Sequence, residues 1–256
     1  MSPLVALAAA LCWVAGACAL VPSGPTVGGS PSAASIVELL ASRRAAFGAV
    51  AMQGQVLVEE STGTTSAQHF ILARAPDKLR VQLVGMGGRP VMLLACSGTR
   101  MVVVDYPRAV AYVGRATRAM VGRFLGVGLT PREAYALLVG AVPTLEGHVE
   151  MRVRRAGQGR WLLRLVRGQV VEELMVELGR GVVHAAWITA PGVGQLSCTY
   201  SNFVRTPAGW IAKNISFSQG QRRLEIYNSR VVANPTLQPR VFSPRLPPGL
   251  KVVHVQ

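Results

Sequence analysis

The chain has 256 residues, half of them hydrophobic, with 27 Lys and Arg against 12 Asp and Glu. The apolar content excludes general disorder, and the length allows one sizeable core. The net charge of +15 favours an acidic partner, either nucleic acid or another anionic surface, and the pattern along the chain has to decide between them.

The N-terminal segment, residues 1–37, carries no charged side chain, and residues 4–21 are an unbroken apolar run. Within this run, the sequence Ala-Gly-Ala-Cys that ends at Cys18 resembles a bacterial lipobox, in which small residues precede a cysteine that receives a diacylglycerol. We expect residues 1–17 to be a lipoprotein signal peptide and Cys18 to become the lipidated N-terminus. Cleavage by ordinary signal peptidase and an uncleaved membrane anchor are the alternatives.

Residues 18–34 are rich in Pro, Gly, Ser and Ala, which is the composition of a flexible linker. As a coil, such a segment spans on the order of 20–25 Å, enough to hold a folded domain just off a membrane. Ala19, rather than Asp, follows the cysteine. Under the sorting rule of Gram-negative lipoproteins, this favours the outer membrane over retention in the inner membrane.

The first ordered pattern predicts a short helix that ends near Gly48. Ser35 and Glu38 have the spacing of a capping box. The apolar residues that follow lie on one helical stripe, namely Ile36, Leu39, Leu40 and Phe47.

Extended segments follow at residues 52–59, 68–74, 79–83, 91–95, 101–104 and 109–113. The third alternates strictly, so that Leu79, Val81 and Leu83 share one face of the strand. The glycine-rich segment Gly85–Pro90 interrupts the strands.

Residues 117–139 change to helical spacing, and the helix beginning after Thr130 has Pro131 at its first position and Glu133 three residues after the cap. Further strands are predicted at residues 149–154, 161–166, 170–178, 182–188, 196–204, 210–217 and 223–232, before an irregular Pro-rich tail at 234–249. Residues 35–256 are therefore predicted to form one α+β domain, with an N-terminal helix, a helical insertion and one large antiparallel sheet.

Enzyme and nucleic-acid functions find little support. The sequence has no nucleophile elbow, zinc-protease or phosphate-loop motif, and its histidines, His69, His148, His184 and His254, are scattered singly. Adjacent acidic pairs such as Glu172 and Glu173 point to opposite faces of a strand, which excludes a joint acid–base role. We expect no catalysis, no metal and no cofactor.

The arginines are dispersed without aromatic residues between them, which favours an anionic envelope surface over nucleic acid.

Two cysteines, Cys96 and Cys198, lie within the predicted domain. In an oxidising compartment they can form a disulfide, and they can equally remain two independent buried thiols.

The order of these segments resembles the LolA/LolB-like family, especially its outer-membrane lipoprotein branch. The resemblance covers roughly residues 35–250. It rests on a series of short matches: the strand Pro76–Arg80, the glycine-rich hairpin, the turn Ser97–Thr99 where the family has Asp-Gly, the strand end Tyr112–Gly114, the two-helix insertion, the strand Leu224–Val231, and the tail from Phe242 to Pro247-Pro248-Gly249.

The resemblance implies an incomplete β-barrel with helices as a lid, which encloses an apolar cavity for acyl chains. It implies lipoproteins or lipid acyl chains as partners, together with a periplasmic carrier protein and the inner leaflet of the outer membrane, reached through the Cys18 lipid. In the receptor branch a loop between early strands projects an apolar Leu toward the membrane, and Met86 stands at that position here.

Five residues on the apolar side of alternating strands are the acyl-cavity candidates: Leu79, Val81, Leu83, Leu224 and Ile226. They can line a cavity, or they can pack beneath the helices of residues 117–139. The second possibility describes a structural or interaction lipoprotein that has a self-filled core and docks a partner on its basic face.

Overall fold

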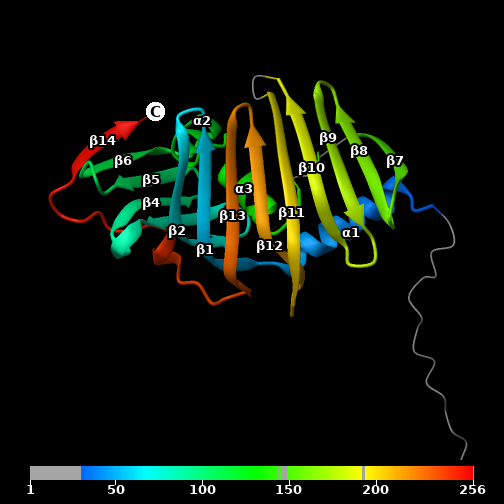
Figure 1. The fold of residues 1–256 in the computed structure, drawn as a ribbon, viewed down its shortest axis with the longest axis horizontal. Coiled ribbons are helices and arrows are strands. Elements are labelled where there is room, and N and C mark those ends of the chain that lie inside the picture. Colours follow the sequence, from blue (N-terminus) through cyan, green and yellow to red (C-terminus); the bar gives the residue numbers. More distant parts are fainter. Residues whose placement is uncertain (1–29, 143–144, 146–148, 192–193, 256) are drawn as a thin grey trace, which may run out of the picture. The chain divides into compact units, whose positions relative to one another are not determined.

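The computed structural model describes residues 30–142, 145, 149–191 and 194–255 (Figure 1). Residues 31–256 form one compact unit that contains every described helix and strand, so this unit can be produced on its own. The predicted signal peptide, Cys18 and His148 lie outside the described residues, as does the predicted linker up to residue 29. In the part of the chain that is described, no helix combines the length and hydrophobicity needed to cross a membrane.

A single curved sheet dominates the described chain, and its fourteen strands have the order β14-β6-β5-β4-β3-β2-β1-β13-β12-β11-β10-β9-β8-β7. The elements are α1 (Ala33–Ala46), β1 (Ala49–Glu60), β2 (Gly63–Arg74), β3 (Lys78–Val84), η1 (Met86–Gly88), β4 (Pro90–Ser97), β5 (Arg100–Asp105), β6 (Val110–Arg115), α2 (Arg118–Leu125), α3 (Pro131–Leu138), β7 (Glu150–Gly157), β8 (Arg160–Arg167), β9 (Val170–Glu177), β10 (Val182–Ala190), β11 (Gly194–Thr206), β12 (Gly209–Gln219), β13 (Arg222–Ala233), η2 (Pro239–Phe242) and β14 (Lys251–Val255).

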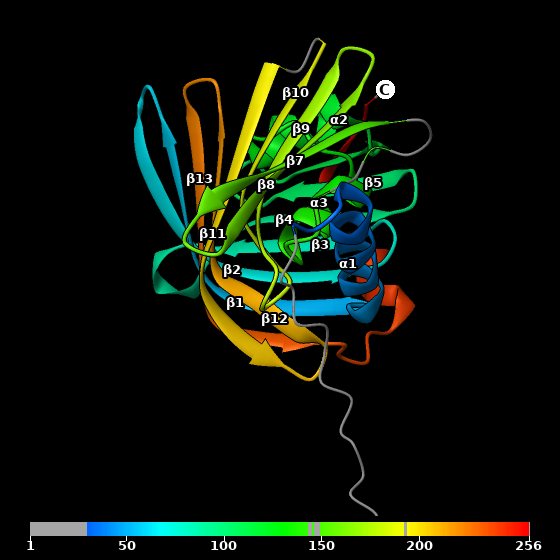
Figure 2. The ribbon, with the colours of Figure 1, turned by 90° about the vertical axis from the view of Figure 1, so that its right-hand side faces the viewer.

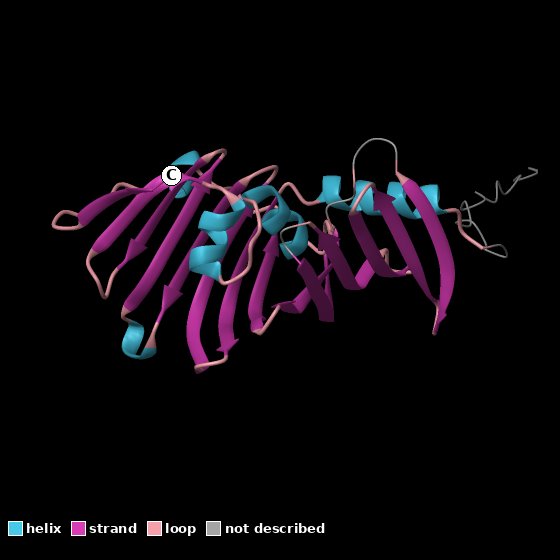
Figure 3. Cartoon of the chain, turned by 90° about the horizontal axis from the view of Figure 1, so that it is seen from above, coloured by secondary structure: helices cyan, strands magenta, loops and turns pink. Residues whose placement is uncertain are grey.

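Two antiparallel meanders, β1–β6 and β7–β13, are joined where β1 pairs with β13. The sheet curls around the helices without closing, because β7 and β14 remain at its two edges (Figures 2 and 3). The predicted fold class, an α+β incomplete barrel with helices on one side, is confirmed. The strand that sequence analysis missed is β14, which pairs in parallel with β6 after the Pro-rich tail.

The helices cover the concave face of the sheet, where most of the core lies (Figure 2). The caps predicted for α3 are confirmed, since Thr130 and Glu133 form a reciprocal capping box with Pro131 inside it. The predicted N-terminus of α1 was wrong. Its cap is Ser32, whose hydroxyl accepts a hydrogen bond from the Ser35 N–H at 3.0 Å, so Ser35 lies inside the helix.

The C-terminal tail crosses the outer face of β3 and β4. Arg80, which alternates with the buried residues of β3, donates to the carbonyl of Val241 at 3.0 Å. Beyond η2, Leu246 and Leu250 pack on a second small core made of Leu93, Val102, Val104 and Ala111. Burial on both faces explains why β4 and β5 are apolar runs rather than alternating strands.

Gly54 marks an irregularity in the pairing of β1 with β13, which shifts register between Gln53 and Gly54. A Cβ atom at Gly54 would lie 1.9 Å from the backbone oxygen of Tyr227, which leaves no room for any side chain. The glycine therefore allows the two meanders to approach at their junction.

Replacement of Gly54 by Ala is predicted to lower the free energy of unfolding by about 3 kcal/mol, because the clash is with backbone and relief requires strand movement. Urea denaturation measures this change. Gly179→Ala is the control, since nothing lies within 4 Å of the added methyl group there. Equal stability of the two variants would contradict the assignment of a tight junction at Gly54.

Candidate functional site

All five acyl-cavity candidates line one apolar pocket between the sheet and the helices. Leu79, Val81 and Leu83 come from β3, while Leu224 and Ile226 come from β13. Phe124 and Leu125 of α2, with Ala134 and Leu138 of α3, form the opposite side. The structure therefore brings together strands that are far apart in sequence, as the predicted cavity requires.

The apolar pocket has a volume of about 90 Å³, well below the roughly 300–1,000 Å³ of typical small-molecule sites. In this state the helices fill most of the space above the five residues. Leu79, Val81 and Ile226 are buried, while Leu83 and Leu224 are half-buried at the margin. An acyl chain fits here only if α2, α3 or the segment between them moves.

Among the described residues, few polar contacts join α2 and the segment after it to the sheet. The Phe124 ring of α2 packs on Tyr112 of β6 with centroids 5.1 Å apart, and the Arg123 guanidinium lies over both rings. The N–H of Gly128, in the segment between α2 and α3, donates to Gln219 Oε1 at 3.1 Å. Such surface interactions contribute little each, so the lid depends mainly on the apolar contacts beneath it.

His69 of β2 supplies a polar atom in the wall of the apolar pocket. Its Nε2 lies 2.9 Å from Asn228 Oδ1, and the Asn228 amide donates to the carbonyl of Lys213 at 2.9 Å. Burial lowers the pKa of His69, although the hydrogen bond to Asn228 opposes this. His69 is thus a buried core histidine, and its burial favours the neutral form. No cluster of three or more metal-ligating side chains occurs among the described residues.

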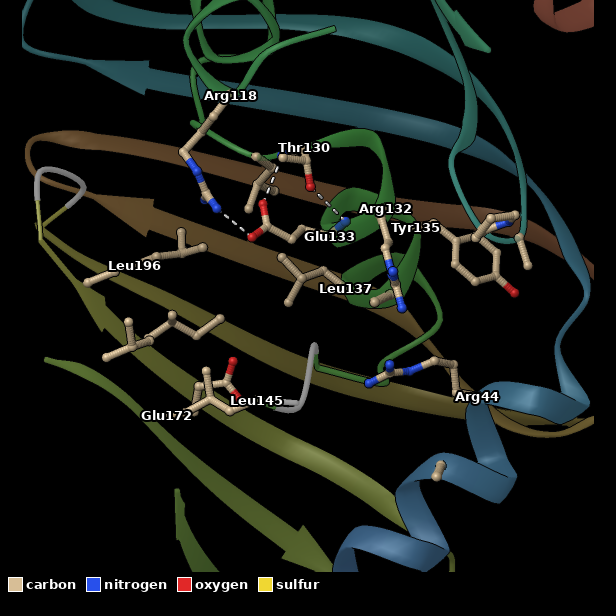
Figure 4. A pocket seen from close by; sticks show the side chains of 18 of the residues that line it. Arg44, Arg118, Thr130, Arg132, Glu133, Tyr135, Leu137, Leu145, Glu172 and Leu196 are labelled. Atoms are coloured by element: carbon tan, nitrogen blue, oxygen red, sulfur yellow. Dashed lines mark hydrogen bonds and ion pairs between the residues drawn. The ribbon is translucent and has the colours of Figure 1, made fainter. Parts of the chain in front are cut away.

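A second and larger space, which we call the arginine cavity, has a volume of about 670 Å³ and lies among α1, α3 and strands β8–β10 (Figure 4). Its charged lining consists of Arg44, Arg118, Arg132, Arg167, Glu133 and Glu172. Leu129 lines both this cavity and the apolar pocket, so the two spaces are neighbours.

Glu172 is the buried carboxyl group of the arginine cavity, with only 3% of the residue exposed. It faces inward in phase with Leu174 and Val176, whereas its neighbour Glu173 faces outward and pairs with Arg164 at 2.8 Å. Glu172 Oε2 has no hydrogen-bond partner among the described residues. Burial raises the pKa of Glu172 to about 8, against the opposing effects of Arg44, the Leu145 backbone and Arg167.

In the sequence, Glu172 stands out only as half of an acidic pair with Glu173. The signal that could have singled it out is its position on the apolar face of an alternating strand, where a carboxylate is costly.

Two adjacent arginines attach α1 to the chain that follows α3. Arg44 donates to the carbonyl of Val142 at 2.6 Å, and Arg43 donates to the carbonyls of Val139 and Trp210. Burial lowers the pKa of Arg43 to about 10. The Tyr135 hydroxyl of α3 also donates to the carbonyl of Phe47, next to α1. The α1 side of the lid is therefore fixed by two arginines and a tyrosine hydroxyl that donate to backbone carbonyls distant in sequence.

Met86 lies at the tip of the β3–β4 connection and is 95% exposed. Gly87 and Gly88 follow with φ values of 72° and 74°, a conformation that favours glycine. The loop thus presents the large apolar side chain of Met86 to solvent.

Cys96 of β4 and Cys198 of β11 are both buried free thiols, so of the two possibilities left open by the sequence, the structure has separate thiols and no disulfide between them. Burial raises the pKa of each to about 12. Both therefore remain protonated and unreactive at neutral pH.

Comparisons of the fold with solved structures agree with this architecture. A LolA superfamily protein from Nitrosomonas europaea matches with a TM-score of 0.59 at 13% identity, over 83% of this chain and 98% of the other. The chain has the LolA-like fold.

Two further structures share the LolA-like fold at 10% identity. A putative outer membrane lipoprotein-sorting protein domain from Vibrio parahaemolyticus has a TM-score of 0.56 and covers 82% of this chain and 97% of its own. A DUF1329 family protein from Desulfovibrio piger has a TM-score of 0.60, over 83% and 98%. No family model and no curated protein matches the sequence.

The raised pKa of Glu172 predicts a pH-dependent stability. The carboxyl group titrates near 4.5 in the unfolded chain and near 8 in the folded protein, so its favourable contribution is complete below pH 4.5 and is lost as the pH rises through 8. The free energy of unfolding should fall by about 2 kcal/mol between pH 6 and pH 8. Glu172→Gln should flatten this dependence in urea denaturation.

Glu173→Gln is the matched control, because it removes the same charge from the outward face of the same strand. A wild-type stability that does not change between pH 6 and pH 8 would contradict the assignment of Glu172 as a neutral buried acid.

Proposed function

We propose that this protein is an exported outer-membrane lipoprotein that binds acyl chains or lipoproteins beneath its helical lid and takes part in their localisation to the outer membrane. The observation that carries the proposal is the meeting of the five predicted residues in one apolar pocket inside a LolA-like sheet. The similarity of the fold to the outer membrane lipoprotein-sorting domain from Vibrio supports the same function. The protein then acts by binding and release, without chemistry.

Acyl-chain entry requires the lid to leave the apolar pocket. The apolar residues of α2 and α3 would be replaced on the sheet by methylene groups, each contributing about 0.8 kcal/mol. The concave face of the sheet is therefore shielded from water in both states, by the helices when the lid is closed and by the acyl chain when it is open. The few polar contacts of α2 make that helix, rather than α1, the part that moves.

Delivery at a membrane would use the exposed loop and the lipid anchor. Cys18 would hold the protein at the inner leaflet of the outer membrane, and the Met86 side chain would enter the bilayer surface. A periplasmic carrier protein would bring cargo to the same site.

The alternative is a structural or interaction envelope lipoprotein with a self-filled core. The small volume of the apolar pocket favours it, because the core of this state is already nearly closed. Exposed arginines on β7, such as Arg152 and Arg154, would then provide the partner-docking face. The two functions differ in whether the compact unit binds a free acyl chain.

The binding experiment uses the compact unit, residues 31–256, and a fluorescent fatty acid. Saturable binding is predicted for the wild type, and Leu224→Trp should weaken it about tenfold by filling the margin of the apolar pocket. Arg223→Trp is the control, because the neighbouring side chain is exposed on the other face of β13. Absence of saturable binding to the wild type would refute the carrier function and favour the structural alternative.

A second experiment tests the loop. Met86→Asp should reduce the amount of the compact unit bound to phospholipid vesicles about tenfold in a sedimentation assay, because burying a Met side chain contributes about 1.5–3 kcal/mol. Met151→Asp is the matched control, an exposed Met on the edge strand β7. An equal loss in both variants would show that the loop has no special role in membrane binding.

A further inference from the structure

The arginine cavity is amphipathic, with both charged and apolar side chains in its wall. Arg132 of α3 and Arg44 of α1 point toward the same part of the space, and Glu172 faces it from β9 (Figure 4). Arg132 and Arg167 are exposed, Arg44 is half-buried and Glu172 is buried, so charge extends from the opening to the interior. Leu129 and Leu137 belong to the apolar remainder of the wall.

Among the described residues that line this cavity, basic side chains outnumber acidic ones. They are four arginines and two carboxyl groups, of which Glu133 pairs with Arg118 at 2.5 Å and accepts from the Thr130 N–H at 2.8 Å. The other, Glu172, is the buried group with an unpartnered oxygen. Guanidinium groups are an unfavourable lining for an acyl chain, because contact with an apolar ligand removes their hydration at a cost in free energy.

We infer that the arginine cavity binds the anionic head group of an amphiphile, a phosphate or carboxylate held near Arg44, Arg132 and Arg167, while the acyl chain passes Leu129 into the apolar pocket. This assignment rests on the proposed function and specifies the class of its ligand. Guanidinium groups bind such anions through charge-assisted hydrogen bonds. The protonated Glu172 carboxyl donates one further hydrogen bond to a head-group oxygen, which its ionised form would repel.

The test compares two lipids with the same chain on the compact unit: lauroyl lysophosphatidylglycerol, which carries a phosphodiester charge, and neutral monolauroylglycerol. Each displaces the neutral fluorescent probe N-phenyl-naphthylamine. We expect the anionic lipid to bind at least about tenfold more tightly. In the double variant Arg132→Gln/Arg167→Gln this preference should fall to about twofold or less, with the affinity for the neutral lipid unchanged.

The matched control is Arg152→Gln/Arg154→Gln, which removes the same net charge from exposed positions outside the cavity and should keep the preference. Equal affinity of the wild type for the two lipids would overturn the head-group assignment and leave the proposed function intact. Failure of both lipids to bind would refute both. Competition by inorganic phosphate at the same concentration as the anionic lipid would show a site for a free anion and would also overturn the assignment.

The role of Glu172 has its own readout. The groups that act on it are Arg44 of α1, Arg167 of β8, Glu133 of α3 and the Leu145 backbone. The affinity for the anionic lipid should fall several-fold between pH 6.5 and pH 9, while the phosphodiester keeps a constant charge. Glu172→Gln should remove this fall and leave the affinity for the neutral lipid unchanged. A wild-type affinity independent of pH would contradict the donor role.

Discussion

The concave face of the sheet is apolar, and the need to keep that face out of water governs the rest of the structure. A flat sheet would expose it, and a closed barrel would fill it with its own side chains. Here the sheet curls and remains open, so its two meanders together form a trough that α1, α2 and α3 cover (Figure 3). On the convex face, the C-terminal tail covers the apolar side chains of β4–β6 and bonds to Arg80 of β3.

The lid is attached unequally, and this difference separates a fixed part from one able to move. Arg43, Arg44 and Tyr135 bind backbone carbonyls where α1 meets the chain after α3. Around α2, the polar and aromatic contacts with the sheet among the described residues are the Tyr112–Phe124 pair, the Arg123 guanidinium over Tyr112 and one hydrogen bond from Gly128. A ligand that replaces the apolar contacts of α2 and separates it from α3 would also break the Arg118–Glu133 ion pair. The arginine cavity is lined by residues of the fixed part, such as Arg44, and also by Arg118 of α2.

Sequence analysis predicted most of the fold because its signals are local. The capping box at Thr130, the strict alternation of β3 and the turns between strands all act within a few residues. The errors have the same origin. Ser35 has the spacing of a cap, but Ser32 stands one turn earlier with the required extended backbone. The strand β14 is short, follows a Pro-rich tail and exists through its parallel pairing with the distant β6.

The sequence predicts which residues line the apolar pocket but not the volume of that pocket. Alternation showed which residues of β3 and β13 face inward, yet the volume left above them depends on how α2 and α3 pack, which no local pattern specifies. Glu172 acquires its raised pKa from burial beneath elements that are distant in sequence, against the opposing effects of Arg44 and Arg167.

The most direct test of a lid that opens for lipid is the distance between the lid and the sheet during lipid binding. Spin labels at Ala119→Cys on α2 and Gln221→Cys in the β12–β13 turn are exposed, while Cys96 and Cys198 stay buried and unlabelled. We predict that double electron–electron resonance will show the distance between the two spin labels increasing with added lipid. The increase should saturate as the binding site fills. Saturable lipid binding with an unchanged distance would contradict the opening of the lid.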